Sequence, residues 1–124
     1  MIEPGQKFIW KRTFTEEEIL RFAELSQDKG VHHIQKDPEG RLMAHGLLTA
    51  TLPTKAGGDL NFIARTMQFD FKLAAYAGDA LTCAGVVDAV IVQSQRYKVR
   101  FSFTVTNQKG ETIMTGTSSG MIKK

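Results

Sequence analysis

A strict alternation of apolar and polar side chains over residues 97–106 constrains the fold of this chain more than any other feature. The apolar side chains, at every second position, are Tyr97, Val99, Phe101, Phe103 and Val105. Successive side chains of a β-strand point to opposite faces of a sheet. The alternation therefore predicts a long strand with one buried face and one face in contact with solvent.

Four other segments predict strands that can pair with this one. Residues 66–72 alternate in the same way, and residues 80–92 are rich in Val, Ala and Ile. Residues 107–110, Asn-Gln-Lys-Gly, predict a hairpin turn that leads into a strand over 111–122. Near the beginning of the chain, residues 6–14 contain aromatic and β-branched side chains. Together these segments predict a long antiparallel sheet.

A helix is predicted directly after the first strand. Thr15-Glu16-Glu17-Glu18 has the spacing of a capping box, in which the Thr15 hydroxyl accepts from the Glu18 N–H and the Glu18 side chain accepts from Thr15. An apolar stripe follows: Ile19, Phe22, Ala23 and Leu25. We expect this helix to end near residues 26–28, before Gly30, and residues 29–41 to form a loop.

The segment Leu42–Gly58 predicts a second, buried helix, because Lys55 is its only charged residue. Pro53 lacks a backbone donor and is expected to kink or end it. One apolar helix beside one long antiparallel sheet favours an α+β fold in which the sheet wraps around the helix. With 124 residues, the chain is expected to form a single domain over residues 1–124.

Composition limits the classes of partner. Sixteen Lys plus Arg against 13 Asp plus Glu give a formal net charge of +3, which suits an anionic small molecule but not a nucleic acid. A single cysteine, Cys83, excludes an internal disulfide and favours a reducing compartment. Neither a secretory signal nor an apolar stretch long enough for a membrane is visible, so we expect a cytoplasmic protein that binds no membrane.

All three histidines, His32, His33 and His45, lie within fourteen residues, and Asp28 precedes them. They can be solvated loop residues, or a metal site completed by Asp28 or Asp37, although the irregular spacing disfavours a metal. A third interpretation is a carboxylate–imidazole pair. Asp28 and His33 are five residues apart across a Gly-containing loop, so both can face one water molecule, which a neutral imidazole can deprotonate.

Gly46 stands at the start of the apolar helix. The first N–H groups of a helix have no partner within it and lie at the positive end of its dipole. Glycine also lets a ligand oxygen come close. A carbonyl placed there would be polarised, although a glycine selected only for the turn into the helix is the simpler alternative.

These residues resemble the hotdog fold, specifically the MaoC-like branch of R-specific enoyl-CoA hydratases. That branch has a Ser-x-Asp-x-Asn-Pro-x-His pattern, which Ser26, Asp28 and His33 match, and a His-Gly at the start of the central helix, which His45-Gly46 matches. The resemblance extends from about residue 5 to residue 122. It departs at Gly30 and Val31, where the family has Asn and Pro.

The resemblance implies hydration of a trans-2-enoyl-CoA, or dehydration of a (3R)-3-hydroxyacyl thioester, with Asp28 and His33 holding the water and the Gly46 N–H binding the thioester carbonyl. A shift of the loop by one residue would put His32 in place of His33. Thr54 falls where the family often has a hydroxyl that supports the aspartate. No cofactor or metal is implied, the thioester carrier is CoA or an acyl carrier, and a homodimer or higher oligomer is expected. Candidate contacts to phosphates are Lys29, Arg41, Arg65, Lys72 and Arg96.

Two other functions fit the same fold. An acyl-CoA thioesterase often has a carboxylate on the central helix, but residues 46–58 contain none. A non-catalytic subunit that binds acyl thioesters would be free to lose the Asn-Pro pair, since a fold does not determine function.

Overall fold

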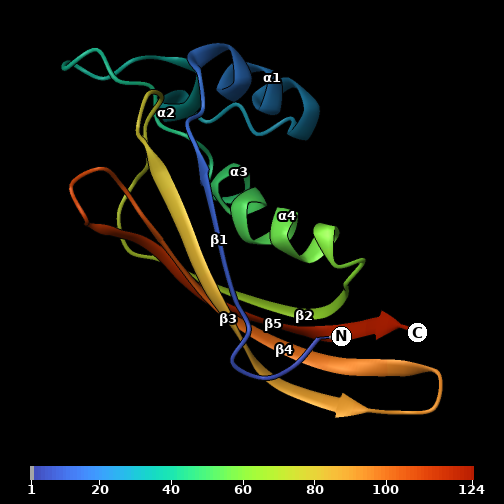
Figure 1. Cartoon of the computed structure of the whole chain (residues 1–124). Coiled ribbons are helices and arrows are strands. Elements are labelled where there is room, and N and C mark those ends of the chain that lie inside the picture. The colour runs from blue at the N-terminus through green and yellow to red at the C-terminus, as the bar shows by residue number, and fades with distance from the viewer. Residues whose placement is uncertain (1) are drawn as a thin grey trace.

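The computed structural model describes residues 2–124. Its five strands form one antiparallel sheet in the order β1-β3-β4-β5-β2. The strands are β1 (Lys7–Arg12), β2 (Ile63–Phe71), β3 (Leu81–Val92), β4 (Arg96–Thr106) and β5 (Thr112–Lys123). The sheet curves around the helices α3 (Gly46–Thr49) and α4 (Thr51–Asp59), which lie on its concave side (Figure 1). This arrangement confirms the predicted α+β hotdog architecture.

The strand predicted from the alternating pattern is β4, and it lies in the middle of the sheet. Its apolar side chains Val99, Phe101, Phe103 and Val105 are buried, whereas the side chains between them face the other side. Each fully buried side chain of this kind contributes roughly 1.5–3 kcal/mol, so the burial pattern fixes which face of the sheet packs on the helices.

The predicted capping box is confirmed at the start of α1 (Glu16–Ser26). The Glu18 N–H donates to the Thr15 hydroxyl at 3.1 Å, and the Thr15 N–H donates to the Glu18 carboxylate at 3.0 Å. The bond from the Thr15 N–H, helped by the Arg12 guanidinium, lowers the pKa of Glu18. The helix ends at Gln27, which adopts a left-handed conformation with φ 63°. The chain then turns toward Asp28.

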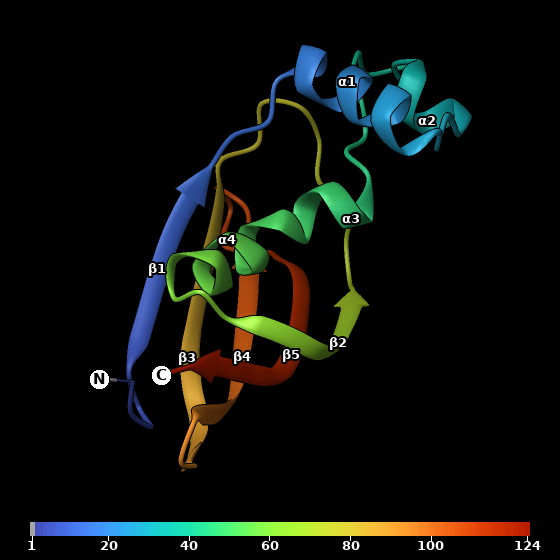
Figure 2. The same cartoon turned by 90° about the vertical axis from the view of Figure 1, so that its right-hand side faces the viewer.

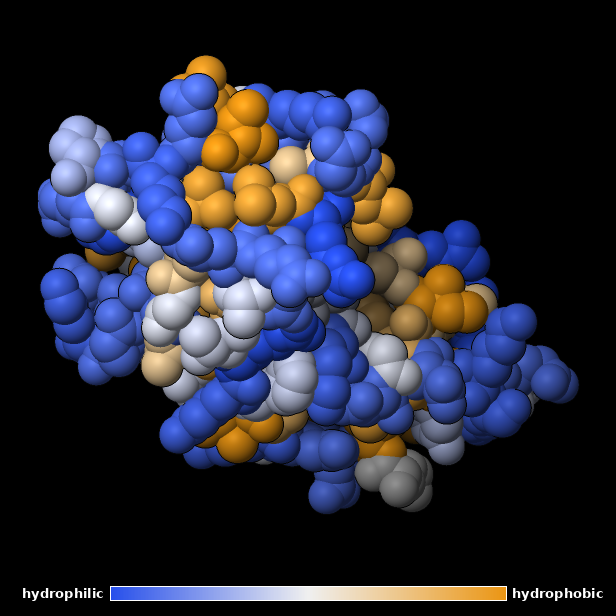
Figure 3. All heavy atoms as spheres, turned by 90° about the horizontal axis from the view of Figure 1, so that it is seen from above, coloured by the Kyte–Doolittle hydropathy of each residue, from blue (hydrophilic) through white to orange (hydrophobic). Residues whose placement is uncertain are grey.

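The predicted loop over residues 29–41 was partly wrong, because α2 (Val31–Ile34) forms within it. Gly30 precedes this single helical turn, and the carbonyl of Gly30 accepts the His33 N–H at 2.8 Å. The rest of the loop turns as predicted around Asp37, whose carboxylate accepts the Arg41 N–H at 2.8 Å. Helices α1 and α2 lie together at one end of the molecule (Figure 1), and the view onto that end shows hydrophobic patches among hydrophilic side chains (Figure 3).

A single helix over Leu42–Gly58 was also wrong. Residues 42–45 are not helical, and Met43 forms an isolated antiparallel bridge with Tyr76. The helical part is divided at Ala50 into α3 and α4. Pro53 explains the division, since it has no N–H to continue the α3 ladder and is tolerated in the first turn of a new helix. The views in Figures 1 and 2 place both helices against the same face of the sheet.

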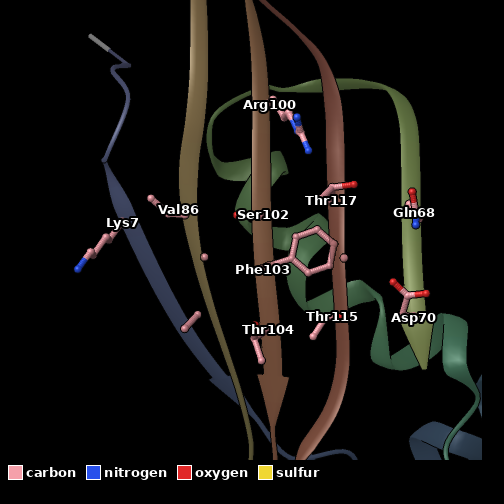
Figure 4. A pocket seen from close by; sticks show the side chains of 13 residues that line it. Lys7, Gln68, Asp70, Val86, Arg100, Ser102, Phe103, Thr104, Thr115 and Thr117 are labelled. Carbon is pink, nitrogen blue, oxygen red and sulfur yellow. The ribbon is translucent and has the colours of Figure 1, made fainter. Parts of the chain in front are cut away.

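The opposite face of the sheet is polar. A hollow of about 740 Å³ crosses it, and its side chains come from all five strands (Figure 4). Short hydroxyl side chains such as Ser102, Thr104, Thr115 and Thr117 form its middle, with Lys7, Asp70 and Arg100 around them. The histidines are not among its lining residues.

Among residues 2–124, none of the helices is both long and apolar enough to cross a membrane.

Candidate active site

Asp28 lies on the short connection between α1 and α2. Its N–H donates to the Ser26 hydroxyl at 3.1 Å, and its carboxylate accepts the Gly30 N–H at 3.3 Å. Both contacts are local, and the residue is exposed. The carboxylate therefore remains accessible to a ligand while its position is set by the connection itself.

His33 points into the molecule from α2 and is 6% exposed. Its Nδ1 lies 2.8 Å from the backbone carbonyl oxygen of Met43. Because a carbonyl oxygen can only accept a hydrogen bond, Nδ1 is the nitrogen that carries the proton in the neutral ring. The other nitrogen, Nε2, then has a lone pair, which is the form that a general base requires.

The structure brings Asp28, His33 and His45 together. One ligand atom from each of the three side chains lies within 4.8 Å of the others. The rings of His33 and His45 are stacked, with centroids 3.8 Å apart and an interplanar angle of 18°. The predicted pair of Asp28 and His33 is thus close in space, and His45 is a third member that the pair interpretation omitted.

The same three residues fit a metal ion poorly. Nδ1 of His33 and Nε2 of His45 already face backbone carbonyl oxygens. The remaining lone pairs lie in two nearly parallel ring planes 3.8 Å apart, so they do not converge on one point as the ligands of a tetrahedral ion do.

His32 lies beside His33 and is exposed to solvent. The two ring centroids are 4.0 Å apart with an interplanar angle of 58°. His32 lies outside the group that contains Asp28. The structure therefore favours the register in which His33 pairs with Asp28, and not the register shifted by one residue.

Gly46 is the first residue of α3 and lines the same pocket as His33. The pocket has a volume of about 420 Å³. Within residues 2–124, no acceptor lies within hydrogen-bond distance of the Gly46 N–H. Met43 lines the pocket as well, and sequence reasoning missed several other lining residues, namely Thr49, Phe71, Leu73, Ala74, Ala75 and Ile113. Of these, Phe71 was recognisable as an apolar residue in the alternation of residues 66–72, but its position beside Gly46 was not.

Comparison with known proteins identifies similar structures but no similar sequence family. No family model matches the sequence, and no curated protein matches it. An (R)-hydratase from A. caviae involved in PHA biosynthesis is similar in structure, with TM-score 0.84 and 25% identity over 98% of this chain and 96% of that chain. The MaoC-like dehydratase from Rhodospirillum rubrum is similar with TM-score 0.80 and 18% identity over 99% and 94% of the two chains. The chain has the hotdog fold that these proteins share.

A hypothetical thioesterase from Streptococcus pneumoniae, in a structure with coenzyme A, is similar to a lower degree. Its TM-score is 0.61 and its identity 16%, over 100% of this chain and 82% of that chain. This TM-score is lower than the values of 0.84 and 0.80 for the two structures named above.

Of the five candidate cations, Lys72 lines the pocket of His33 and Gly46. Lys29 pairs with Glu24 at 2.9 Å, and Arg41 pairs with Asp37 at 3.0 Å. The other two, Arg65 and Arg96, line a separate groove on the sheet.

The position of Thr54 does not support Asp28 within the chain. The Thr54 hydroxyl donates to the carbonyl of Thr51 at 3.0 Å. It lines a different pocket, between α4 and the sheet, together with Phe62 and Phe101. Within residues 2–124, Thr54 makes no hydrogen bond to Asp28.

Proposed function

We propose that this chain catalyses the addition of water to a trans-2-enoyl-CoA and the reverse dehydration of a (3R)-3-hydroxyacyl thioester. The observation that carries the proposal is that Gly46, whose N–H donates no hydrogen bond within residues 2–124, lines the same pocket as His33, whose proton on Nδ1 leaves a lone pair on Nε2. The Asp28 carboxylate completes the group within 4.8 Å. The structural likeness to an (R)-hydratase supports the same reaction class.

The reaction uses each group once. Asp28 and His33 hold one water molecule, and Nε2 of His33 takes a proton from it as the oxygen adds to C3. The electron pair of the C2–C3 double bond moves toward the thioester carbonyl, whose oxygen accepts the Gly46 N–H. The protonated His33 then returns a proton to C2, so the sum is the addition of one water molecule. No cofactor takes part in this scheme, because the thioester itself makes C2 acidic.

Coenzyme A or an acyl carrier would hold the acyl group. We assign Lys72 to the phosphate-bearing part, because it lines the pocket of His33 and has no ion-pair partner among residues 2–124. An exposed lysine is a point charge that can follow a phosphate without a fixed geometry.

We further propose that the chain is a homodimer joined along β2. This strand is at the edge of the sheet and pairs only with β5. Its exposed apolar side chains include Met67 at 40% and Phe71 at 52%, and Leu47 beside the pocket is 64% exposed. Unpaired edges and exposed apolar side chains invite a second copy, and a twofold pairing would cover both. Light scattering at micromolar concentration tests this, and a monomer there contradicts it.

The test of the activity uses purified protein and a short trans-2-enoyl-CoA. Loss of the conjugated enoyl-thioester absorbance without release of free thiol supports the proposal. Asp28→Asn and His33→Ala should each lower turnover by about 10²-fold or more. Asp59→Asn is the matched control, because Asp59 is an exposed carboxylate at the end of α4 paired with Lys55. Normal turnover in both site variants contradicts the assignment.

A thioesterase is the second candidate, favoured by the structural likeness to the Streptococcus pneumoniae protein. In that reaction Asp28 would activate water toward the carbonyl carbon. Release of free thiol in the same assay would decide for it.

A further inference from the structure

The proposed reaction leaves His45 without a role, although its side chain is only 2% exposed. His45 Nε2 lies 2.9 Å from the backbone carbonyl oxygen of Asp28, seventeen residues earlier in the chain. The carbonyl can only accept, so Nε2 carries the proton and donates. The other nitrogen, Nδ1, is buried and has no hydrogen-bond partner within residues 2–124. A buried polar atom without a partner is costly, so its retention needs a reason.

The ring of His45 packs against two other rings. Its stacking partner on one side is His33, at a centroid distance of 3.8 Å. Phe22 of α1 packs edge-on at 4.8 Å with an interplanar angle of 63°. The ring therefore cannot turn without disturbing the imidazole of the proposed base, and the direction of its N–H is fixed.

The backbone of His45 is equally constrained. It is the residue before α3, and its carbonyl accepts the Thr49 N–H at 3.0 Å and the Thr49 hydroxyl at 3.2 Å. The next residue is Gly46. His45 is thus linked to all three parts that the proposed reaction needs. It is hydrogen-bonded to the Asp28 connection, its ring stacks on His33, and it directly precedes Gly46 in the chain.

We propose that His45 is a positioning residue that holds the Asp28 connection in register with His33 and Gly46 through its Nε2–H. This role rests on the proposed hydratase function. The other hydrogen bonds of Asp28 are to its sequence neighbours Ser26 and Gly30, so they shape the connection but do not hold it against the rest of the site. A reacting group displaced by about 1 Å can cost on the order of 10²-fold in rate.

The experiment separates the donor from the ring. In His45→Phe the ring can still stack and the Nδ1 lone pair is gone, but the donor to Asp28 is lost. In His45→Gln the stacking is lost, but an amide N–H can reach the Asp28 carbonyl. Asp59→Asn is again the control, because Asp59 is an exposed carboxylate at the end of α4 paired with Lys55.

We expect His45→Phe to lower kcat by about 10- to 100-fold with KM changed less than about threefold. We expect His45→Gln to recover to within about threefold of the parent, and Asp59→Asn to be unchanged. Amide hydrogen exchange at Lys29 and Gly30 should accelerate in His45→Phe only. A merely structural residue would give equal losses in both His45 variants, or a loss that follows the unfolding temperature, and either result overturns the proposal.

One measurement does not depend on activity or on a substitution. In the parent protein, nitrogen NMR of the imidazole rings should show the proton of neutral His45 on Nε2, and a proton on Nδ1 instead overturns the proposal even where His45→Phe does not fold. If the parent turns over no enoyl thioester, the proposed function fails. The tautomer and the exchange rates then still decide whether His45 holds the Asp28 connection.

Discussion

Replacing Gly46 by proline removes the backbone N–H that we assign to the thioester oxygen. Gly46 is the first residue of α3, a position where proline is favoured because its N–H is not needed within the helix. The residue before proline must be extended, and His45 has φ −63° and ψ 144°. The Gly46 N–H has no acceptor within residues 2–124, so no hydrogen bond of the chain is lost.

The cost to stability is expected to be small. A Cβ at position 46 would approach Phe71 Cε1 to 2.9 Å, so the ring must move. The Phe71 side chain is 52% exposed and can rotate toward solvent. Restricting the unfolded chain contributes about 0.4–1 kcal/mol in the opposite direction. We expect the free energy of unfolding to change by less than about 1 kcal/mol.

The cost to catalysis is expected to be large. Removal of one donor to a developing oxyanion lowers kcat by about 10²–10³-fold, or about 2.7–4 kcal/mol. Gly46→Ala is the control, because it adds the same Cβ next to Phe71 but retains the N–H. The assay is enoyl-thioester hydration by both variants at saturating substrate, with thermal unfolding in parallel. Equal kcat in Gly46→Pro and Gly46→Ala would refute the role of this N–H.

The remaining predictions concern stability, reactivity and the histidine register. Thr15→Ala removes the cap of α1 and should cost about 1 kcal/mol, seen as a lower midpoint in denaturant. Because the Thr15 N–H lowers the pKa of Glu18, the carboxylate stabilises the fold fully above its unfolded pKa and loses this effect as pH falls through the folded pKa. Glu18→Gln should therefore flatten the acid limb of a stability–pH curve, and an unchanged limb contradicts this. Burial raises the pKa of the Cys83 thiol to about 11, so alkylation near pH 8 should be at least about 100-fold slower than for free cysteine until urea unfolds the chain. His32→Ala should leave turnover within about twofold, whereas a loss as large as that of His33→Ala would mean that the register is wrong.

The sequence predicted those parts of the fold that a local pattern determines. The alternation of β4 and the capping box of α1 depend on neighbours within a few residues, and both are confirmed. The helix over Leu42–Gly58 was wrong because its apolar composition is set by the sheet beneath it, whereas its division at Ala50 is set by Pro53. Composition shows that a segment is buried but does not show where its backbone changes direction.

The candidate site was predictable where its residues are close in the chain. Asp28 and His33 are five residues apart, and one turn of α2 brings them together. His45 reaches the same group from seventeen residues away, through a ring that stacks on His33, and no periodicity carries that information. Thr54 is a different case, since a spacing taken from relatives suggested that it supports Asp28, whereas its hydroxyl donates to the carbonyl of Thr51.

The replacement of Asn-Pro by Gly30 and Val31 bears on whether the chain is a catalyst or only binds acyl thioesters. Val31 is the first residue of α2, the position where proline is also favoured, so a helix can begin there with either residue. Gly30 has φ −50° and ψ 141°, which any residue adopts, although a Cβ there would lie 3.1 Å from Cε1 of His32. With Gly30 and Val31, the connection between α1 and α2 therefore has more conformational freedom in the unfolded chain than it would with Asn and Pro. The folded conformation of the connection need not differ. Since Asp28 and His33 still lie together, the lost Asn-Pro pair is weak evidence for a non-catalytic subunit. A more flexible connection also increases the need for a contact from outside it, and the Nε2–H of His45 supplies one.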